Sequence, residues 1–150
     1  MTRSLIAALL CLAAFTACSD TLKPFTSDGC SAFPDGTLQQ QSRWVTCCIR
    51  HDLAYWKGGS YAQRVQADRS LQRCVQQVGE RQIADLMLAG VRVGGSPYWP
   101  TSFRWGYGWS YGRGYKPLSE EERQEVKAQL INLRLLLETL DKELEDGISR

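Results

Sequence analysis

The sequence predicts a mainly α fold, in which two antiparallel, disulfide-linked helices precede a long C-terminal helix. Residues 41 to 95 carry apolar side chains at helical spacing, interrupted by Gly58 and Gly59, with the second helix starting near Ser60. A further helical pattern runs from Ser119 to about Gly147. No segment alternates apolar and polar residues convincingly, as a half-buried strand does.

The first residues predict export. Arg3 precedes an uncharged, largely apolar run from Leu5 to Ala17, which is too short to span a membrane and is typical of a signal peptide covering residues 1–17. The run ends in Phe-Thr-Ala-Cys, which resembles a lipobox in which Cys18 receives lipid and becomes the N-terminus. We expect a membrane-anchored lipoprotein of the cell envelope, with free secretion as the alternative.

Export decides how the cysteines are interpreted. Cys11 leaves with the signal and Cys18 would carry lipid. The cysteines that remain are Cys30, Cys47, Cys48 and Cys74. Four cysteines in an oxidising compartment predict two disulfides, and three pairings stay open. A zinc site that includes the single histidine is the less favoured alternative. Because the charge is nearly balanced and no basic block is present, nucleic acid is not an expected partner.

The first predicted helix concentrates reactive side chains on two adjoining faces. Cys47, His51 and Tyr55 recur every four residues and therefore share one face. Cys48 and Asp52 share the neighbouring face. A single helix thus carries two cysteines, the only histidine and a carboxylate within six residues.

The second predicted helix places a carboxylate inside an apolar stripe. The stripe consists of Val65, Leu71, Val75 and Val78, and Asp68 lies in its middle. A buried carboxylate needs hydrogen-bond donors. If Cys74 is joined to Cys47 or Cys48, the helices are antiparallel and Asp68 can hold His51 in one tautomer, as a general base requires. Alternatively, His51 is a core residue that makes its hydrogen bonds within the fold and has no chemical role, and Asp68 is exposed at the surface.

Together these motifs resemble the secreted phospholipase A2 superfamily, and most closely its bacterial and fungal branch. That superfamily carries C-C-x-x-H-D-x-x-Y on its first catalytic helix, and residues 47–55 read CCIRHDLAY. Its second catalytic helix has an aspartate six residues before a cysteine, as Asp68 and Cys74 are here. The segment SDGCSAFPDG resembles its calcium loop, with Asp-x-Cys followed by Pro-Asp. The matches run from Asp28 to Cys74, inside a phospholipase A2-like domain predicted for residues 18–96.

The resemblance implies calcium-dependent hydrolysis of the sn-2 ester of phospholipids at a membrane surface. His51 would deprotonate a water, Asp68 would hold the other imidazole nitrogen, and Tyr55 would donate a hydrogen bond to Asp68. Asp52 would bind Ca²⁺. The other implied ligands are backbone oxygens around Asp28 and Gly29, with Ser31 and Phe33 as further candidates.

The resemblance also implies the disulfide pairs Cys30–Cys48 and Cys47–Cys74. This loop has fewer glycines than that of the animal enzymes, and glycine lets carbonyl groups turn toward a metal at low cost. A non-catalytic, phospholipase-like envelope lipoprotein that binds lipid, glycan or a protein partner is therefore the alternative function.

Residues 97–117 form a segment rich in aromatic residues and glycine, for which two interpretations stay open. Trp99, Trp105 and Trp109 are candidates for membrane contact, because tryptophan favours the headgroup level of a bilayer. Alternatively, the aromatic side chains fold back over the core. A carbohydrate-binding platform is a third and less favoured interpretation.

The sequence pattern of residues 118–150 predicts an amphipathic helix, which begins with a capping box of Ser119 and Glu122. Its apolar seam repeats at steps of four and three and consists of Val126, Leu130, Leu133, Leu137, Leu140 and Leu144. Such a seam favours either self-association as a coiled coil or docking along the preceding domain.

Overall fold

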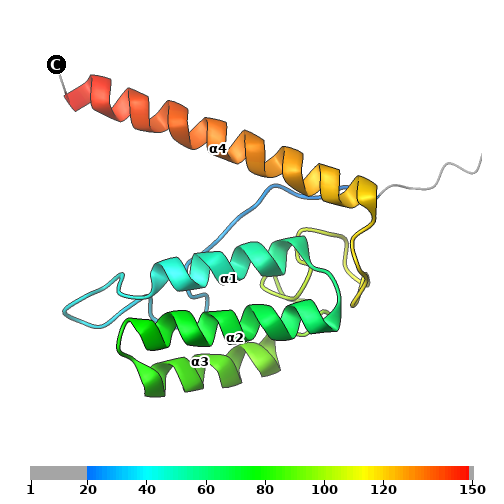
Figure 1. The fold of residues 1–150 in the computed structure, drawn as a ribbon, viewed down its shortest axis with the longest axis horizontal. Helices are drawn as coiled ribbons and strands as arrows, with labels where there is room; N and C mark the ends of the chain where they lie inside the picture. The colour runs from blue at the N-terminus through cyan, green and yellow to red at the C-terminus, as the bar shows by residue number, and fades with distance from the viewer. Residues whose placement is uncertain (1–19, 149–150) are drawn as a thin grey trace, which may run out of the picture.

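A computed structural model describes residues 20–148, which form four α-helices and no strand (Figure 1). The helices are α1 (Val45–Lys57), α2 (Tyr61–Gln77), α3 (Arg81–Gly94) and α4 (Glu120–Ile148). α1 packs against α2, α2 packs against α3, and α4 extends away from these three (Figure 1). The mainly α class is therefore confirmed for the described residues. The predicted signal peptide and the predicted lipid attachment point, Cys18, lie outside them.

The helix ends follow the local sequence signals. Gly58 ends α1 with a φ of 67°, in the left-handed region, and a Cβ there would lie 3.0 Å from Gly106 Cα. Ser60 caps α2 in a capping box with Gln63. The capping box predicted for α4 is also present, since the Ser119 hydroxyl accepts from the Glu122 amide while the Glu122 carboxylate accepts from the Ser119 amide.

Two disulfides fix the arrangement of the first helices. Cys47, near the start of α1, is bonded to Cys74, near the end of α2, so the two helices run antiparallel. Cys30 is bonded to Cys48 and ties the preceding loop to α1. Both pairings are the ones that the resemblance implied. The core around them consists of Trp44, Leu71, Val75, Ala84 and Met87.

The aromatic segment folds over the C-terminal end of α1. Trp105 and Trp109 are 2% and 0% exposed, and their indole N–H groups donate to the carbonyls of Gly59 and Lys57 at 2.9 and 2.8 Å. The prediction that these two tryptophans contact a membrane is therefore wrong. Only Trp99, at 55% exposure, remains at the surface.

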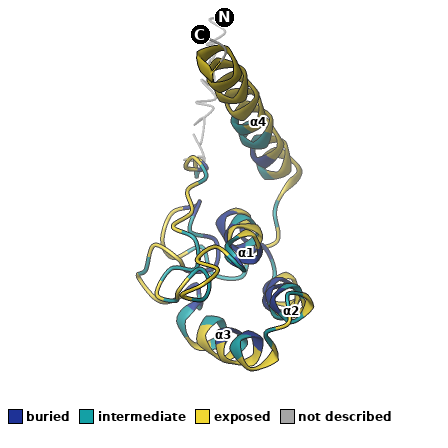
Figure 2. Ribbon diagram, turned by 90° about the vertical axis from the view of Figure 1, so that its left-hand side faces the viewer, coloured by how far each residue is buried: buried dark blue, intermediate teal, exposed yellow. Residues whose placement is uncertain are grey.

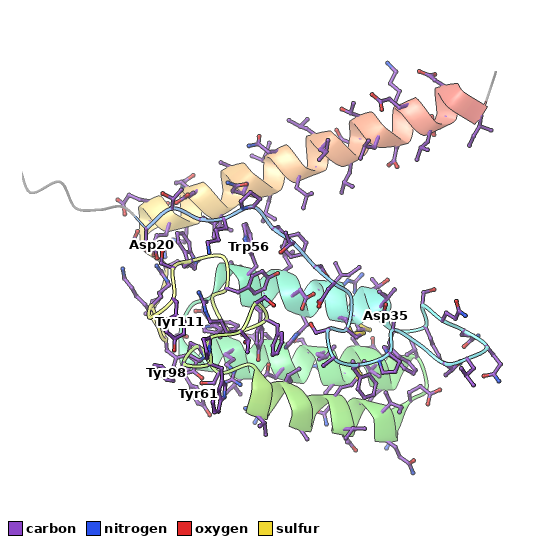
Figure 3. All side chains as sticks on the ribbon, turned by 180° about the vertical axis from the view of Figure 1, so that it is seen from behind. Asp20, Asp35, Trp56, Tyr61, Tyr98 and Tyr111 are labelled. Carbon is purple, nitrogen blue, oxygen red and sulfur yellow. A yellow bond between two sulfur atoms is a disulfide. The ribbon has the colours of Figure 1, made fainter. Side chains whose placement is uncertain are left out.

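Glycine explains why this segment can approach α1 so closely. A Cβ at Gly108 would lie 2.6 Å from the Trp56 ring. The outer edge of the segment is aromatic too, and Figure 3 shows Tyr98 and Tyr111 gathered beside Tyr61 of α2.

Only the first turns of α4 pack against the rest of the molecule. Val126 is buried, and it belongs to a cluster with Leu22, Trp56 and Trp109. Beyond this point the helix becomes exposed (Figure 2). Docking of the whole seam along the preceding domain is therefore wrong, because the helix axis leaves the body after about three turns. No helix in the described part of the chain is long and apolar enough to cross a membrane.

Candidate active site

Asp68 of α2 faces His51 of α1, as the helical phase predicted. Asp68 is fully buried, and its Oδ1 lies 3.0 Å from His51 Nε2. The Tyr55 hydroxyl donates to the same oxygen at 2.7 Å. Because an ionised carboxylate can only accept, Nε2 carries the proton and Nδ1 is left as the basic nitrogen of the ring. The disulfide that joins α1 to α2 holds the two side chains in this register.

Two arginines balance the buried charge of Asp68. Arg92 Nε lies 2.8 Å from Asp68 Oδ2, an ion-pair contact in which the N–H is not aligned with the oxygen. Arg64 Nε lies 4.0 Å from the same oxygen and donates to the Tyr55 hydroxyl at 3.1 Å. Two cations beside a buried carboxylate offset its charge, and an ionised carboxylate stabilises a protonated imidazole.

Sequence reasoning missed both arginines. Arg64 precedes Asp68 by four residues on α2, a spacing that places the two side chains together and could have revealed the pair. Arg92 belongs to α3, and no local pattern connects it with Asp68. Burial, with Asp68 as the second cause, raises the pKa of Tyr55, so this hydroxyl stays protonated and continues to donate.

An apolar cavity of about 410 Å³ opens beside His51 and Asp52. Its apolar walls consist of Phe33, Leu71, Leu86, Met87, Val91 and Phe103. Gly90 and Gly94 of α3 line it without side chains and so leave room in it. Leu86 and Phe103 are also exposed to solvent, at 59% and 38%, so the cavity opens to the surface next to them. Its size and lining suit a hydrophobic chain whose reacting group reaches His51.

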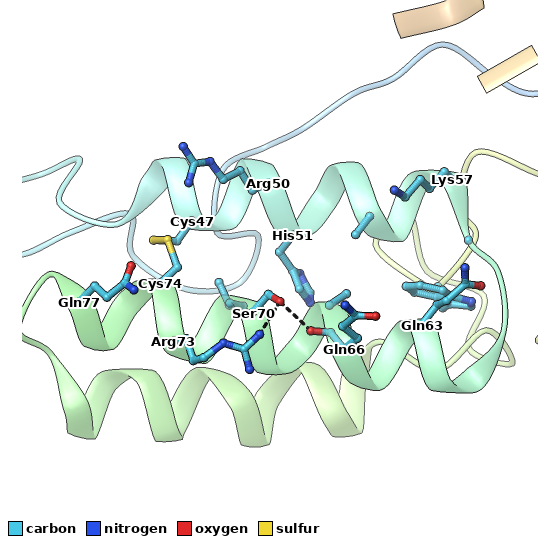
Figure 4. Close-up of a pocket in the computed structure, with 15 residues that line it drawn as sticks. Cys47, Arg50, His51, Lys57, Gln63, Gln66, Ser70, Arg73, Cys74 and Gln77 are labelled. Atoms are coloured by element: carbon cyan, nitrogen blue, oxygen red, sulfur yellow. Dashed lines mark hydrogen bonds between the residues drawn. A yellow bond between two sulfur atoms is a disulfide. The ribbon is translucent and has the colours of Figure 1, made fainter. Parts of the chain in front are cut away.

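His51 also borders a second hollow of about 490 Å³ between α1 and α2, which is more polar (Figure 4). Its charged lining residues are Arg50, Lys57 and Arg73, and no carboxylate belongs to it. The apolar cavity is the better candidate for a lipid substrate, because it alone combines His51, Asp52 and hydrophobic walls.

Asp52 lies at a third, smaller hollow of about 170 Å³, to which the loop before α1 contributes. The Ser27 hydroxyl donates to Asp52 Oδ2 at 2.6 Å, and the Ser31 hydroxyl donates to Asp28 Oδ1 at 2.9 Å. Burial raises the pKa of Asp52 to about 6, and the nearby negative charge of Asp28 adds to this rise, while Ser27 and His51 oppose it.

The residues at this hollow fit a hard cation. Their polar groups are oxygens, and a desolvated carboxylate next to a second carboxylate favours a bound positive charge. In residues 20–148 no three His, Cys, Asp or Glu side chains gather as a metal cluster, so carbonyl oxygens and waters would complete the shell. Asp28, Ser31 and Asp52 line this hollow, whereas Gly29 and Phe33 line the adjoining apolar cavity.

The loop itself is held in an unusual conformation by Asp35. Gly29 and Ser31 both have positive φ, at 79° and 55°. Asp35 Oδ1 accepts from the Cys30 amide at 2.8 Å, and a Cβ at Gly29 would lie 2.4 Å from this oxygen. Sequence reasoning used Asp35 only as part of a Pro-Asp motif and did not assign it this supporting role.

Comparison with protein-family models, with curated proteins and with solved structures finds no match for this chain, so its function is inferred from the geometry of this site. That geometry comprises a carboxylate-held imidazole, an adjacent carboxylate with oxygen neighbours, and a hydrophobic cavity that reaches both. Such an arrangement can deprotonate a water and present it to an ester whose acyl chain occupies the cavity.

Proposed function

We propose that the protein is a calcium-dependent phospholipase A2-like hydrolase, which cleaves the sn-2 ester of glycerophospholipids. The observation that carries this proposal is the buried contact of 3.0 Å between His51 Nε2 and Asp68 Oδ1, beside an apolar cavity that also reaches Asp52. A carboxylate-held imidazole supports general-base chemistry, and hydrophobic walls support a lipid substrate.

In the proposed reaction His51 Nδ1 accepts a proton from a water, and the water oxygen attacks the ester carbonyl. Asp68 stabilises the imidazolium that forms, because its Oδ1 already accepts from Nε2. The imidazolium then gives its proton to the leaving alcohol. Tyr55 keeps the Asp68 carboxylate oriented through its hydrogen bond of 2.7 Å.

The proposed cofactor is Ca²⁺, held by the Asp52 carboxylate and by oxygens of the loop around Asp28 and Ser31. When bound, the ion would supply positive charge for the substrate phosphate and for the oxyanion that develops at the ester. The raised pKa of Asp52, about 6, supports this assignment, because a carboxylate that is costly to ionise alone gains most from a cation.

The membrane-contact surface in this proposal differs from the one expected from composition. Leu86 and Phe103 line the apolar cavity and are also exposed, so they lie where a lipid would enter. Trp99 is exposed as well, and its indole N–H donates to the Val93 carbonyl at the end of α3. Leu86 and Phe103 therefore replace Trp105 and Trp109 as candidates for contact with the bilayer, and Trp99 remains one.

The test is release of fatty acid from phospholipid vesicles with calcium and with a chelator. We expect release with calcium only, and from the sn-2 position only. Asp52→Asn is expected to abolish release, whereas Asp85→Asn, which changes an exposed carboxylate on α3, serves as the matched control and leaves release unchanged. Calcium-independent release would overturn the proposed cofactor, and an absence of release would favour the non-catalytic alternative.

A further inference from the structure

Most of α4 presents an apolar face that nothing in residues 20–148 covers. Leu137, Leu140 and Leu144 are 52%, 44% and 64% exposed, although they continue the seam that begins at the buried Val126. Figure 2 shows the helix buried at its base and exposed along its remaining length. A row of leucines at heptad spacing on a protruding helix fits another helix with the same spacing.

The charges along α4 favour a second copy of the same helix, in antiparallel orientation. Residues 138–146 contain five carboxylates and one lysine, which give a net charge of 1 − 5 = −4. The charged residues among residues 126–137 are Lys127 and Arg134 alone, which give a net charge of +2. In the antiparallel register given below, residues 138–146 lie opposite residues 131–139 of the other copy, in which the charges of Arg134 and Glu138 cancel, so the two acidic ends lie apart. Parallel pairing would bring two acidic ends together, and like charges repel.

We propose that the exported protein forms a dimer through antiparallel pairing of α4 with α4 of a second copy. Val126 stays in its own core, so the pairing uses only the seam beyond it. The matching register sets Leu133 against Leu144 of the second copy and Leu137 against its Leu140. Because each body is attached to the N-terminal end of its α4, the two bodies lie at opposite ends of the paired helices. This dimer does not depend on the proposed hydrolase activity.

The oligomeric state tests the proposal directly. Sedimentation equilibrium of the chain from residue 18, with Cys18→Ser to remove the lipid attachment point, is expected to give twice the mass of one chain. Leu137→Glu combined with Leu140→Glu is expected to give the mass of one chain. Leu135→Glu is the matched control, because Leu135 is similarly exposed, at 55%, but lies on the opposite side of the helix.

A wild-type monomer would overturn the proposal, and so would a double variant that remains dimeric or a control variant that dissociates. A wild-type monomer that binds lipid vesicles through the same leucines would also overturn it, since a bilayer would then be the partner. Circular dichroism of each variant separates dissociation from unfolding.

Cross-linking tests the orientation. Leu133→Cys and Leu144→Cys variants are mixed and oxidised, and antiparallel pairing predicts a disulfide only between one copy of each. Within either variant the two introduced side chains would be about 16 Å apart along the helix axis, which exceeds the span of a disulfide. Disulfide formation within a single variant would show parallel pairing and would refute the proposed orientation.

Discussion

Replacing Asp52 by asparagine should stabilise the calcium-free protein, because the Asp52 carboxylate is costly to ionise where it lies. Its pKa is about 6 in the folded chain, against 3.8 for an ordinary aspartate, chiefly through burial. Below both values the carboxyl group is protonated in the folded and unfolded chains alike. Between them the unfolded chain loses its proton first, so the free energy of unfolding falls as pH rises, and it levels off above pH 6.

The pKa difference sets the size of this effect. Two pKa units correspond to about 3 kcal/mol, which we reduce to about 1–2 kcal/mol because the carboxylate borders a hollow within reach of water. Asp52→Asn removes this cost, and its amide oxygen can still accept from Ser27. The variant should therefore match the wild type near pH 3.5 and exceed its free energy of unfolding by about 1–2 kcal/mol at pH 8.

Urea unfolding at a series of pH values, with a chelator present, measures the difference. Asp85→Asn is the control and should follow the wild type at every pH. Added calcium should reverse the order at pH 8, since the ion binds the folded wild type and stabilises it, whereas the variant has lost the ligand. An Asp52→Asn variant that is less stable than the wild type at pH 8 without calcium would refute the reasoning.

Three further substitutions test the remaining parts of the site. Asp68→Asn leaves the buried Arg64 guanidinium and the partly exposed Arg92 guanidinium without their counter-charge, so it should lower the free energy of unfolding by about 3 kcal/mol in urea titration and abolish hydrolysis. Gly29→Ala brings a Cβ into the carboxylate that supports the loop and should weaken calcium binding in calorimetry, whereas Gly112→Ala, with φ also positive but open space around it, should not. Replacing Cys47 and Cys74 by alanine opens a loop of 27 residues and should lower the free energy of unfolding by about 3.5 kcal/mol. Unchanged values in these variants would contradict the respective assignments.

The sequence was sufficient to predict the central pair of side chains because two independent local signals agree there. The apolar stripe of α2 fixes the side of the helix on which Asp68 lies, and the cysteines restrict how α2 can lie against α1. These two restrictions bring Asp68 to His51, and the structure places Asp68 Oδ1 3.0 Å from His51 Nε2. Arg92 could not be predicted in the same way, because its contact with Asp68 depends on how α3 packs against α2.

Exposure was the property that sequence patterns predicted least well. Trp105 and Trp109 lie in a segment with the composition of a membrane-contact surface, but they are buried. The close approach of this segment to the end of α1 depends on Gly58 and Gly108, where a Cβ would lie 3.0 Å from Gly106 Cα and 2.6 Å from the Trp56 ring. The apolar seam of α4 was predicted correctly. The spacing of its leucines, however, does not specify whether the surface that covers them belongs to the same molecule or to another one. Both properties depend on contacts between distant segments, and local periodicity does not record them.

The role of His51 as general base is the central claim, and hydrolysis by the His51→Gln variant tests it most directly. Fatty-acid release from vesicles that carry a labelled sn-2 chain is measured with calcium, for the wild type and for the variant. The glutamine amide can still donate to Asp68, so circular dichroism should show an intact fold. We predict release by the wild type and none by the variant. Equal release by a folded variant would contradict the account.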